Sequence, residues 1–361
     1  MNRLKVGVIG CGNISPAYLT YLKNSSKVTI TACADLLPDK AQERASEFGI
    51  ENAYTVEGML KSDVDIILNL TIPAAHAEIS IAALDHGKHV YTEKPLAVSL
   101  TDGKRILELA ARKGLVVGSA PDTFLGSGIQ TSRQAILSGA IGRPVAASAF
   151  MMGGGPEGWH PNPAFFYMAG GGPMFDMGPY YLTTLVRLLG PISRISGSVG
   201  SQIPERKVGS GPLAGTPILV QTPTHYSGTL DFAGGAIATL ITSFDIPGGS
   251  ILPRIEIYGT EGTLLVPDPN YFDGEVKIRK AGSEEWETVD PSFESIGNER
   301  GRGLEDMAEA IAESRPPLAS GVLAYHVLEA MHAFSRSSQE GRHVVLESTA
   351  ELTAVLAQNQ K

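Results

Sequence analysis

The chain has few cysteines, no long apolar run and no excess of positive charge, and each absence excludes a class of protein. Its 361 residues contain two cysteines, Cys11 and Cys33. Two cysteines cannot make the disulfide framework of a secreted scaffold in so long a chain, so we expect a reducing compartment. No stretch approaches the ~18 apolar residues of a membrane span. A strand pattern begins at Leu4, which leaves no room for a targeting sequence, and we expect a cytoplasmic protein.

Basic stripes and sets of metal ligands are also missing. The formal net charge is −9, from 29 Lys and Arg against 38 Asp and Glu. A nucleic-acid binder would usually carry a basic stripe. His86 and His89 flank a Gly-Lys turn, but no cysteine or third ligand is in frame, so we expect no metal. The partner is predicted to be a small molecule, and neither a nucleic acid nor a membrane.

What is present is an ordinary globular composition with an alternating first third. A chain of this length predicts two domains. Short apolar runs alternate with helical patterns, which indicates βαβ units and a parallel sheet. The expected strands are 5–9, 28–34, 66–70, 89–91 and 115–118, and the expected helices start at Pro16 and cover 38–48, 75–85 and 100–113.

From about Asp122 the pattern changes to long alternating stretches. In residues 224–232 one face carries His225, Ser227, Thr229 and Asp231, and the other carries Tyr226, Leu230 and Phe232. Such alternation is typical of an antiparallel sheet with one covered face. Further strands are expected at 237–244, 255–258, 263–266 and 275–278, with helices at 304–313 and 322–336. The segment 197–217, rich in Gly, Pro and Ser, is interpreted as a surface excursion.

These patterns predict an α/β chain with two domains. Residues 1–122 form an N-terminal Rossmann domain. Residues 123–361 form an α+β domain for substrate binding and oligomerisation, built on a large open sheet that is mainly antiparallel. A late helix at about 321–337 is expected to pack back near the interface. Because a sheet with one bare face is often covered by another subunit, we expect a homodimer or homotetramer.

The first strand leads into a glycine turn, V-G-V-I-G-C-G-N-I-S. Gly10 allows the tight turn, Gly12 lets the backbone approach a pyrophosphate, and Ser15 is small enough for helix–strand packing. Backbone N–H groups of the turn and helix start, including those of Asn13 and Ile14, are expected to bind the anion. The strand–turn–helix context makes this a dinucleotide site.

The second strand ends in A-C-A-D. Asp35 therefore stands where a carboxylate accepts the ribose hydroxyls of NAD. An NADP enzyme would favour a cation, and Leu36, Leu37 and Pro38 supply none. We predict NAD rather than NADP.

After the fourth strand comes Y-T-E-K-P-L-A, residues 91–97. With the glycine turn, the Glu93-Lys94-Pro95 motif resembles the Gfo/Idh/MocA family of oxidoreductases, which includes glucose–fructose oxidoreductase and inositol dehydrogenase. The resemblance covers essentially the whole chain.

The resemblance implies roles for several residues. Lys94 would reach the nicotinamide and the reacting oxygen, and a cis peptide before Pro95 would aim it. Glu93 would touch the nicotinamide ribose. Thr71, Ile72, Pro73 and His76 match the loop that lines the cofactor in the family, and the region of Asp122 and Phe124 often supplies a polar cofactor contact.

A later run, G-G-G-P-M-F-D-M-G-P-Y, resembles the catalytic segment of the family. Helical periodicity from about Met174 would put Asp176 and Tyr180 on one helix face. The family commonly has histidine where this chain has Tyr180, which weakens the transfer of mechanism from the histidine members. An ammonium near a phenol favours the phenolate, so Tyr180 beside Lys94 is a candidate base. A buried core aromatic is the alternative for Tyr180, and a helix-start acid for Asp176.

The Gly/Pro-rich run 153–167 carries Trp159 and His160. In the family this loop borders the substrate pocket, and an aromatic platform with a histidine suits a sugar ring. The prediction is an NAD-dependent dehydrogenase acting on a secondary alcohol or ketone of a sugar, polyol or derivative. Two alternatives stay open, namely a glycoside-cleaving enzyme that oxidises its sugar transiently with NAD, and a non-catalytic NAD-sensing regulator.

Overall fold

The computed structural model describes residues 3–350, which fall into two compact units. The first unit holds residues 3–125 and 296–328, and the second holds residues 126–295 and 329–350. The predicted domain boundary after residue 122 remains a prediction. The segment 296–328 belongs to the first compact unit, because its helix α9 (Arg302–Glu313) lies against β6 (Val117–Ser119).

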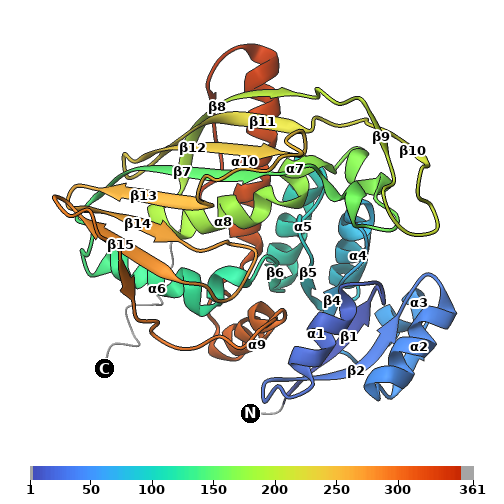
Figure 1. The fold of residues 1–361 in the computed structure, drawn as a ribbon. Helices are drawn as coiled ribbons and strands as arrows, with labels where there is room; N and C mark the ends of the chain where they lie inside the picture. The colour runs from blue at the N-terminus through green and yellow to red at the C-terminus, as the bar shows by residue number, and fades with distance from the viewer. Residues whose placement is uncertain (1–2, 351–361) are drawn as a thin grey trace. The chain divides into compact units, whose positions relative to one another are not determined.

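A six-stranded parallel sheet forms the centre of the first unit (Figure 1). Its order is β3-β2-β1-β4-β5-β6, so the order reverses between β1 and β4, where open α/β sheets bind ligands. The other strands are β1 (Leu4–Ile9), β2 (Val28–Ala34), β3 (Asn52–Tyr54), β4 (Ile66–Asn69) and β5 (His89–Thr92). The helices are α1 (Ser15–Leu22), α2 (Pro38–Phe48), α3 (Val56–Lys61), α4 (Pro73–Asp85) and α5 (Leu100–Lys113).

The local sequence explains where these helices begin and end. Ser99 caps α5 by accepting the N–H of Asp102 at 3.1 Å. Gly49 and Gly114 end α2 and α5 in the left-handed conformation that glycine tolerates. The sequence did not indicate β3 and α3, which are too short to show a period.

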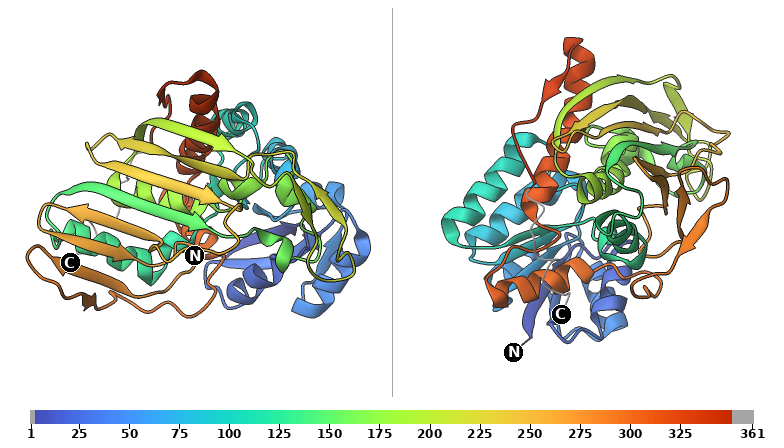
Figure 2. Two further views of the ribbon diagram at one scale, coloured as in Figure 1. Left: turned by 45° about the horizontal axis from the view of Figure 1, so that its top comes forward. Right: turned by 90° about the vertical axis from the view of Figure 1, so that its left-hand side faces the viewer.

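The second unit is built on a nine-stranded sheet (Figure 2). Its order is β16-β15-β14-β13-β7-β12-β11-β8-β17; β7 and β12 pair in parallel, and the other pairs in the described sheet are antiparallel. The strands are β7 (Pro144–Met152), β8 (Ile192–Gly200), β11 (His225–Phe232), β12 (Ile237–Ser243), β13 (Ile255–Gly259), β14 (Gly262–Val266), β15 (Val276–Lys280), β16 (Glu287–Val289) and β17 (Val344–Val345).

The two faces of this sheet differ in burial. In β11, Tyr226, Leu230 and Phe232 are buried, whereas Thr229 is exposed, in the alternation that the sequence predicted. The buried face is covered by the helices of this unit. Its close packing is visible at Gly228, where an added Cβ would lie 2.8 Å from the ring of Phe334 on α10 (Gly321–Glu340).

The expected continuous helix through Asp176 and Tyr180 is wrong. The structure has α7 (Gly172–Asp176) and α8 (Gly178–Leu189), with a break at Met177. Pro179 stands in the first turn of α8 and has no N–H to donate to the preceding turn. Asp176 and Tyr180 therefore belong to different helices, and the argument from one helix face fails. The described part of this unit also contains α6 (Ser127–Leu137) and two short 3-10 helices, Pro156–Gly158 and Ala164–Tyr167.

The segment 197–217 is more ordered than a surface excursion. It contains the end of β8 and a hairpin of β9 (Glu205–Lys207) and β10 (Pro217–Leu219). Arg206 in β9 is only 5% exposed. Gly209, Gly211 and Gly215 lie between the two short strands of the hairpin, whereas β9 carries the buried arginine.

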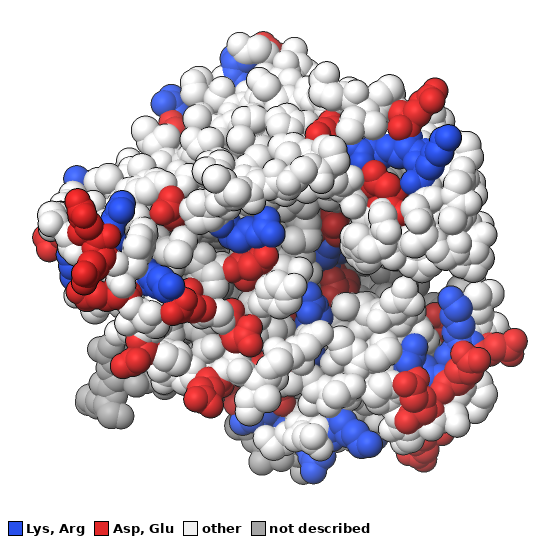
Figure 3. All heavy atoms as spheres, in the orientation of Figure 1, with Lys and Arg blue, Asp and Glu red and all other residues white. Residues whose placement is uncertain are grey.

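On the face drawn in Figure 3, positive and negative side chains are interspersed. No helix within residues 3–350 is both long enough and apolar enough to cross a bilayer.

Candidate active site

The glycine turn after β1 has the geometry that a dinucleotide requires. Gly10 has a φ of 102°, and an added Cβ would lie 2.6 Å from the carbonyl carbon of Leu70. The backbone around Gly12 is open, since an added Cβ would meet no atom within 4 Å. A pyrophosphate can therefore approach the turn at Gly12 and the exposed Asn13.

Asp35 at the end of β2 is fixed beside this turn. Its Oδ2 accepts the N–H of Cys11 at 2.8 Å, and its Oδ1 accepts that of Leu37 at 2.9 Å. Leu37 and Ile72 are 53% and 66% exposed, which is unusual for large apolar residues at a strand end. A carboxylate that can accept ribose hydroxyls and apolar side chains that can contact the adenine base both fit NAD.

The thiols of Cys11 and Cys33 are free. A hydrogen bond to Cys33, together with burial, raises the pKa of the Cys11 thiol.

The loop after β4 is organised by Asn69 and His76. The Asn69 amide donates to the His76 carbonyl at 3.0 Å, and its Oδ1 accepts the Thr71 hydroxyl at 2.7 Å. The His76 ring is 1% exposed and lies between two carbonyls, 2.7 Å from that of Pro95 and 3.0 Å from that of Thr71. Burial lowers the pKa of His76 against the opposite effect of these carbonyls. The ring thus links this loop to the Glu93–Pro95 turn.

The Glu93–Pro95 turn is braced from several sides. Glu93 is 8% exposed; its Oε1 accepts the Tyr18 hydroxyl at 2.8 Å, and its Oε2 accepts the backbone N–H of Lys94 at 2.9 Å. The Lys94–Pro95 peptide is cis, as expected. Lys94 itself is partly exposed. We name the set Gly10–Ser15, Asp35, Thr71–His76 and Glu93–Pro95 the cofactor edge.

Asp122 lies deeper in the first unit than a direct cofactor contact would suggest. It is 1% exposed, and its Oδ2 accepts the N–H groups of Gly301 at 2.9 Å and Gly303 at 3.0 Å. Burial raises its pKa to about 6, although the two N–H donors act in the opposite direction. Through these two hydrogen bonds the Asp122 carboxylate fixes the start of α9.

In the second unit, the segment of the predicted acid/base residues is well packed. Tyr180 on α8 is 6% exposed, and Asp176 at the end of α7 is partly exposed. Both residues have interaction partners. Tyr181, its neighbour, is 1% exposed and turns its hydroxyl to the Phe150 carbonyl at 3.5 Å.

The run 153–167, here called the aromatic loop, clusters its rings. Trp159 is 69% exposed and meets the ring of His160 edge-on at 5.5 Å. His160 also meets Phe165 and Phe166 edge-on at 5.5 and 5.3 Å, and its Nδ1 accepts the N–H of Asn162 at 3.1 Å. An exposed indole beside an oriented imidazole can stack on a sugar ring and bond its hydroxyls.

Comparison with known proteins identifies the family. The model described as "Oxidoreductase family, NAD-binding Rossmann fold" matches residues 4–120, and that of the "GFO/IDH/MocA C-terminal domain" matches residues 129–265. The chain belongs to the GFO/IDH/MocA oxidoreductase family. This confirms three predictions from the sequence, namely the family, the fold class and NAD as the cofactor.

Relatives within the GFO/IDH/MocA family act on sugars and polyols. The chain is 23% identical to myo-inositol 2-dehydrogenase of Thermotoga maritima over 347 residues, covering 95% of this chain and 99% of the relative. It is 26% identical to levoglucosan dehydrogenase of Pseudarthrobacter phenanthrenivorans over 291 residues, covering 73% and 74%. The structure of a levoglucosan dehydrogenase with NADH and L-sorbose has the same fold, with a TM-score of 0.81 and 24% identity over 96% of this chain and 100% of that one. The chain is an oxidoreductase of the CH–OH type, as predicted.

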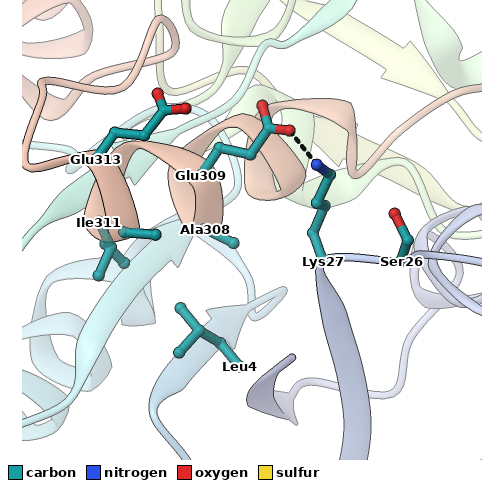
Figure 4. A pocket seen from close by; sticks show the side chains of 8 residues that line it. Leu4, Ser26, Lys27, Ala308, Glu309, Ile311 and Glu313 are labelled. Atoms are coloured by element: carbon teal, nitrogen blue, oxygen red, sulfur yellow. Dashed lines mark ion pairs between the residues drawn. The ribbon is translucent and has the colours of Figure 1, made fainter. Parts of the chain in front are cut away.

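Two described cavities are separate from the cofactor edge. One, of about 460 Å³, lies by Leu4 and Lys27, where β1 and β2 begin, and two of its lining residues, Lys27 and Glu309, form an ion pair of 2.5 Å (Figure 4). Because NAD binds at the carboxyl ends of the strands, this cavity is at the wrong edge. The other, of about 300 Å³, lies between α6 and β15 and is lined mainly by acids and hydroxyls. The described residues contain no group of three or more His, Cys, Asp or Glu placed for a metal.

Sequence reasoning missed two residues that hold the site. Asn69 lies in the predicted apolar strand 66–70, and Arg206 lies in the segment 197–217 that the sequence predicts as a surface excursion. Asn69 is fully buried. An asparagine in an apolar run must find hydrogen-bond partners when buried, and this was the available signal. Arg206 had no comparable signal, since an arginine in a Gly-rich segment is usually solvated.

Proposed function

We propose that this family member oxidises a secondary hydroxyl of a cyclic sugar, polyol or anhydrosugar to a ketone, or reduces the ketone in the reverse direction. The observation that carries the proposal is the bracing of Lys94. Its backbone is bonded by Glu93, and the next carbonyl meets the buried ring of His76. Hydrogen bonds that fix the backbone in this way are typical of a residue whose side chain must point in one direction. A lysine that is merely solvated at the surface needs no such support.

The cofactor edge would hold the dinucleotide. Gly10, Gly12, Asn13 and Ile14 would bind the pyrophosphate through the backbone, and Asp35 would accept the ribose hydroxyls. Thr71, Ile72 and His76 would shape the loop beside it, and Glu93 would orient the nicotinamide ribose. NAD, when bound, supplies the acceptor for the hydride.

Side chains of this protein would accept the proton that leaves the substrate hydroxyl. We propose that the Lys94 ammonium favours the phenolate form of Tyr180, that this phenolate takes the hydroxyl proton and becomes a phenol, and that Asp176 bonds a substrate hydroxyl or Lys94. Trp159 would stack on the sugar ring, and His160 would bond a ring hydroxyl. In the reverse direction, Tyr180 would return the proton to the carbonyl oxygen.

The cell and the assembly belong to the same proposal. Free thiols at Cys11 and Cys33 fit a reducing cytoplasm. The open face of the nine-stranded sheet, with Ile237 53% exposed, favours a homodimer or homotetramer through that face. The alternatives with transient NAD or without catalysis gain no support from relatives that are named dehydrogenases.

The test is NADH formation over a panel of inositols, sugars and anhydrosugars, with Lys94→Ala and Tyr180→Phe run beside the wild type. We expect sustained NADH from at least one substrate, a loss of kcat in both variants on the order of a hundredfold or more, and NADH binding close to wild type in Tyr180→Phe. Tight NADH binding without turnover of any substrate would overturn the proposal. Tyr181→Phe is the matched control, because it removes a neighbouring phenol that bonds a carbonyl.

A further inference from the structure

A buried arginine lies under the aromatic loop. The Arg206 side chain is 2% exposed and forms two ion pairs of 2.5 Å, from Nη1 to Glu157 Oε1 and from Nη2 to Asp245 Oδ1. It also donates to the carbonyls of Gly154 at 3.0 Å and Phe244 at 2.9 Å. Its guanidinium lies 5.0 Å above the ring of Tyr167, whose hydroxyl bonds Glu157. We name Arg206, Glu157, Tyr167 and Asp245 the arginine clamp.

The clamp joins two parts of the second unit. Glu157 and Gly154 belong to the base of the aromatic loop, whereas Asp245 and Phe244 follow β12 of the large sheet. Arg206 itself comes from the β9–β10 hairpin, opposite Ile218 in the register. The hairpin is seated in a small core of Tyr167, Val208, Ile218 and Phe244. The loop is therefore fixed to the sheet by one cation supplied from a third segment.

The backbone repeats this attachment. Gly209 after β9 donates to the Glu157 carbonyl at 2.8 Å, and Gln221 after β10 donates to the Tyr167 carbonyl at 2.8 Å. Gly155 has a φ of 89°, and an added Cβ would lie 2.3 Å from the Tyr167 hydroxyl. The loop base thus has little freedom, while Trp159, two residues after Glu157, stays exposed.

We propose that Arg206 is a positioning residue for substrate recognition, which fixes Trp159 and His160 against the sugar through Glu157. The inference rests on the proposed function of the aromatic loop. A buried cation is costly unless it is paired, and apolar side chains could fill the same volume. The position of this cation between a loop and a sheet is explained if it holds the loop in one position. A displaced binding group loses activity strongly even when it does not touch the reacting atoms.

The test compares the two ion pairs of the same arginine. Glu157→Gln releases the loop side, and Asp245→Asn releases the sheet side. Both are made in a Trp286→Phe background, which leaves Trp159 as the single tryptophan. Fluorescence anisotropy of Trp159 reports the loop, KM and kcat report the sugar, and NADH titration reports the cofactor.

Glu157→Gln is expected to lower the Trp159 anisotropy and raise the sugar KM on the order of tenfold, with a smaller change in kcat and unchanged NADH affinity. Tyr167→Phe should give the same pattern more weakly, and Asp245→Asn should affect thermal stability more than KM. An unchanged KM in Glu157→Gln, or equal KM increases in Glu157→Gln and Asp245→Asn, would overturn the proposal. If the wild type oxidises no sugar, the proposed function fails and substrate positioning fails with it. A lowered anisotropy would then still show the loop attachment.

Discussion

The cofactor edge and the aromatic loop are held in place by different means. At the cofactor edge, polar side chains bond backbone groups of neighbouring βα units. Asp35 accepts two N–H groups, and the His76 ring joins two carbonyls. The aromatic loop instead depends on one buried guanidinium from a hairpin about 50 residues further along the chain. One region is fixed by several separate hydrogen bonds to backbone groups, and the other mainly by the ion pairs of one guanidinium.

This difference predicts how each region fails. Hydrogen bonds to backbone groups are modest in net energy and are spread over several residues. A buried ion pair, once broken, leaves an uncompensated charge and fails as a whole. A single substitution in the arginine clamp should therefore lower the free energy of unfolding more than a substitution of a buried carboxylate in the first unit.

The largest effect is expected for Arg206→Met. Asp245 is 4% exposed and would lose its cation, so the free energy of unfolding should fall by about 3–5 kcal/mol. Arg194→Met is the matched control, because Arg194 is 52% exposed and its pair with Asp231 should contribute less than ~1 kcal/mol. Urea unfolding of both variants measures the difference. Equal losses would contradict the contrast between buried and surface pairs.

Asp122 offers the corresponding test in the first unit, since its partners are backbone N–H groups. Burial raises its pKa from 3.8 to about 6, so the folded form binds more protons than the unfolded chain between these pH values. The contribution of Asp122 to the free energy of unfolding is therefore greatest below the lower value. It is lost as the pH rises through 6, by roughly 3 kcal/mol.

Asp122→Asn should remove this pH dependence while keeping an acceptor for Gly301 and Gly303. Thermal or urea unfolding from pH 4 to 7 should show the variant gaining stability relative to the wild type as the pH rises. Asp102→Asn at the start of α5 is a control, as its carboxylate bonds the Ser99 hydroxyl near the surface. A constant difference between Asp122→Asn and the wild type at every pH would refute the assignment.

The same contrast explains what could be predicted from the sequence. The glycine turn, Asp35 and Glu93-Lys94-Pro95 stand at strand ends, and the carboxyl ends of parallel strands share one sheet edge. Local patterns therefore sufficed to place the proposed cofactor residues at one edge of the sheet. Alternation in β11 likewise predicted which side chains are buried.

Prediction failed where position depends on contacts distant in sequence or on a local break. The clamp requires Arg206 to meet Glu157 and Asp245, and no short motif contains all three. The periodicity around Asp176 predicts one continuous helix, but Pro179 lacks an N–H and the structure has two helices with a break at Met177. Both errors concern the substrate side, where loops determine the position of side chains.

A smaller effect is expected from the two glycines of the turn. Gly10→Ala should lower stability by about 1–3 kcal/mol and abolish NADH binding, because a side chain is strained at φ 102° and would strike Leu70. Gly12→Ala should unfold like the wild type, since its Cβ enters open space, yet bind NADH more weakly. Thermal unfolding and fluorescence titration with NADH separate the two. A stability loss in Gly12→Ala equal to that in Gly10→Ala would argue against Gly12 as the point of approach.

The variants with the smallest expected effect on stability separate the cofactor edge from the aromatic loop most clearly. Ile72 and Trp159 are 66% and 69% exposed, so Ile72→Ser and Trp159→Ala should each change the free energy of unfolding by less than ~0.5 kcal/mol. Ile72→Ser should weaken NADH binding severalfold, on the order of 1 kcal/mol, and leave the sugar KM unchanged. Trp159→Ala should raise the sugar KM by a similar factor and leave NADH binding unchanged. If either variant changed both affinities alike, the cofactor edge and the aromatic loop would not be separate binding surfaces, and the assignment of Trp159 to the sugar would fail.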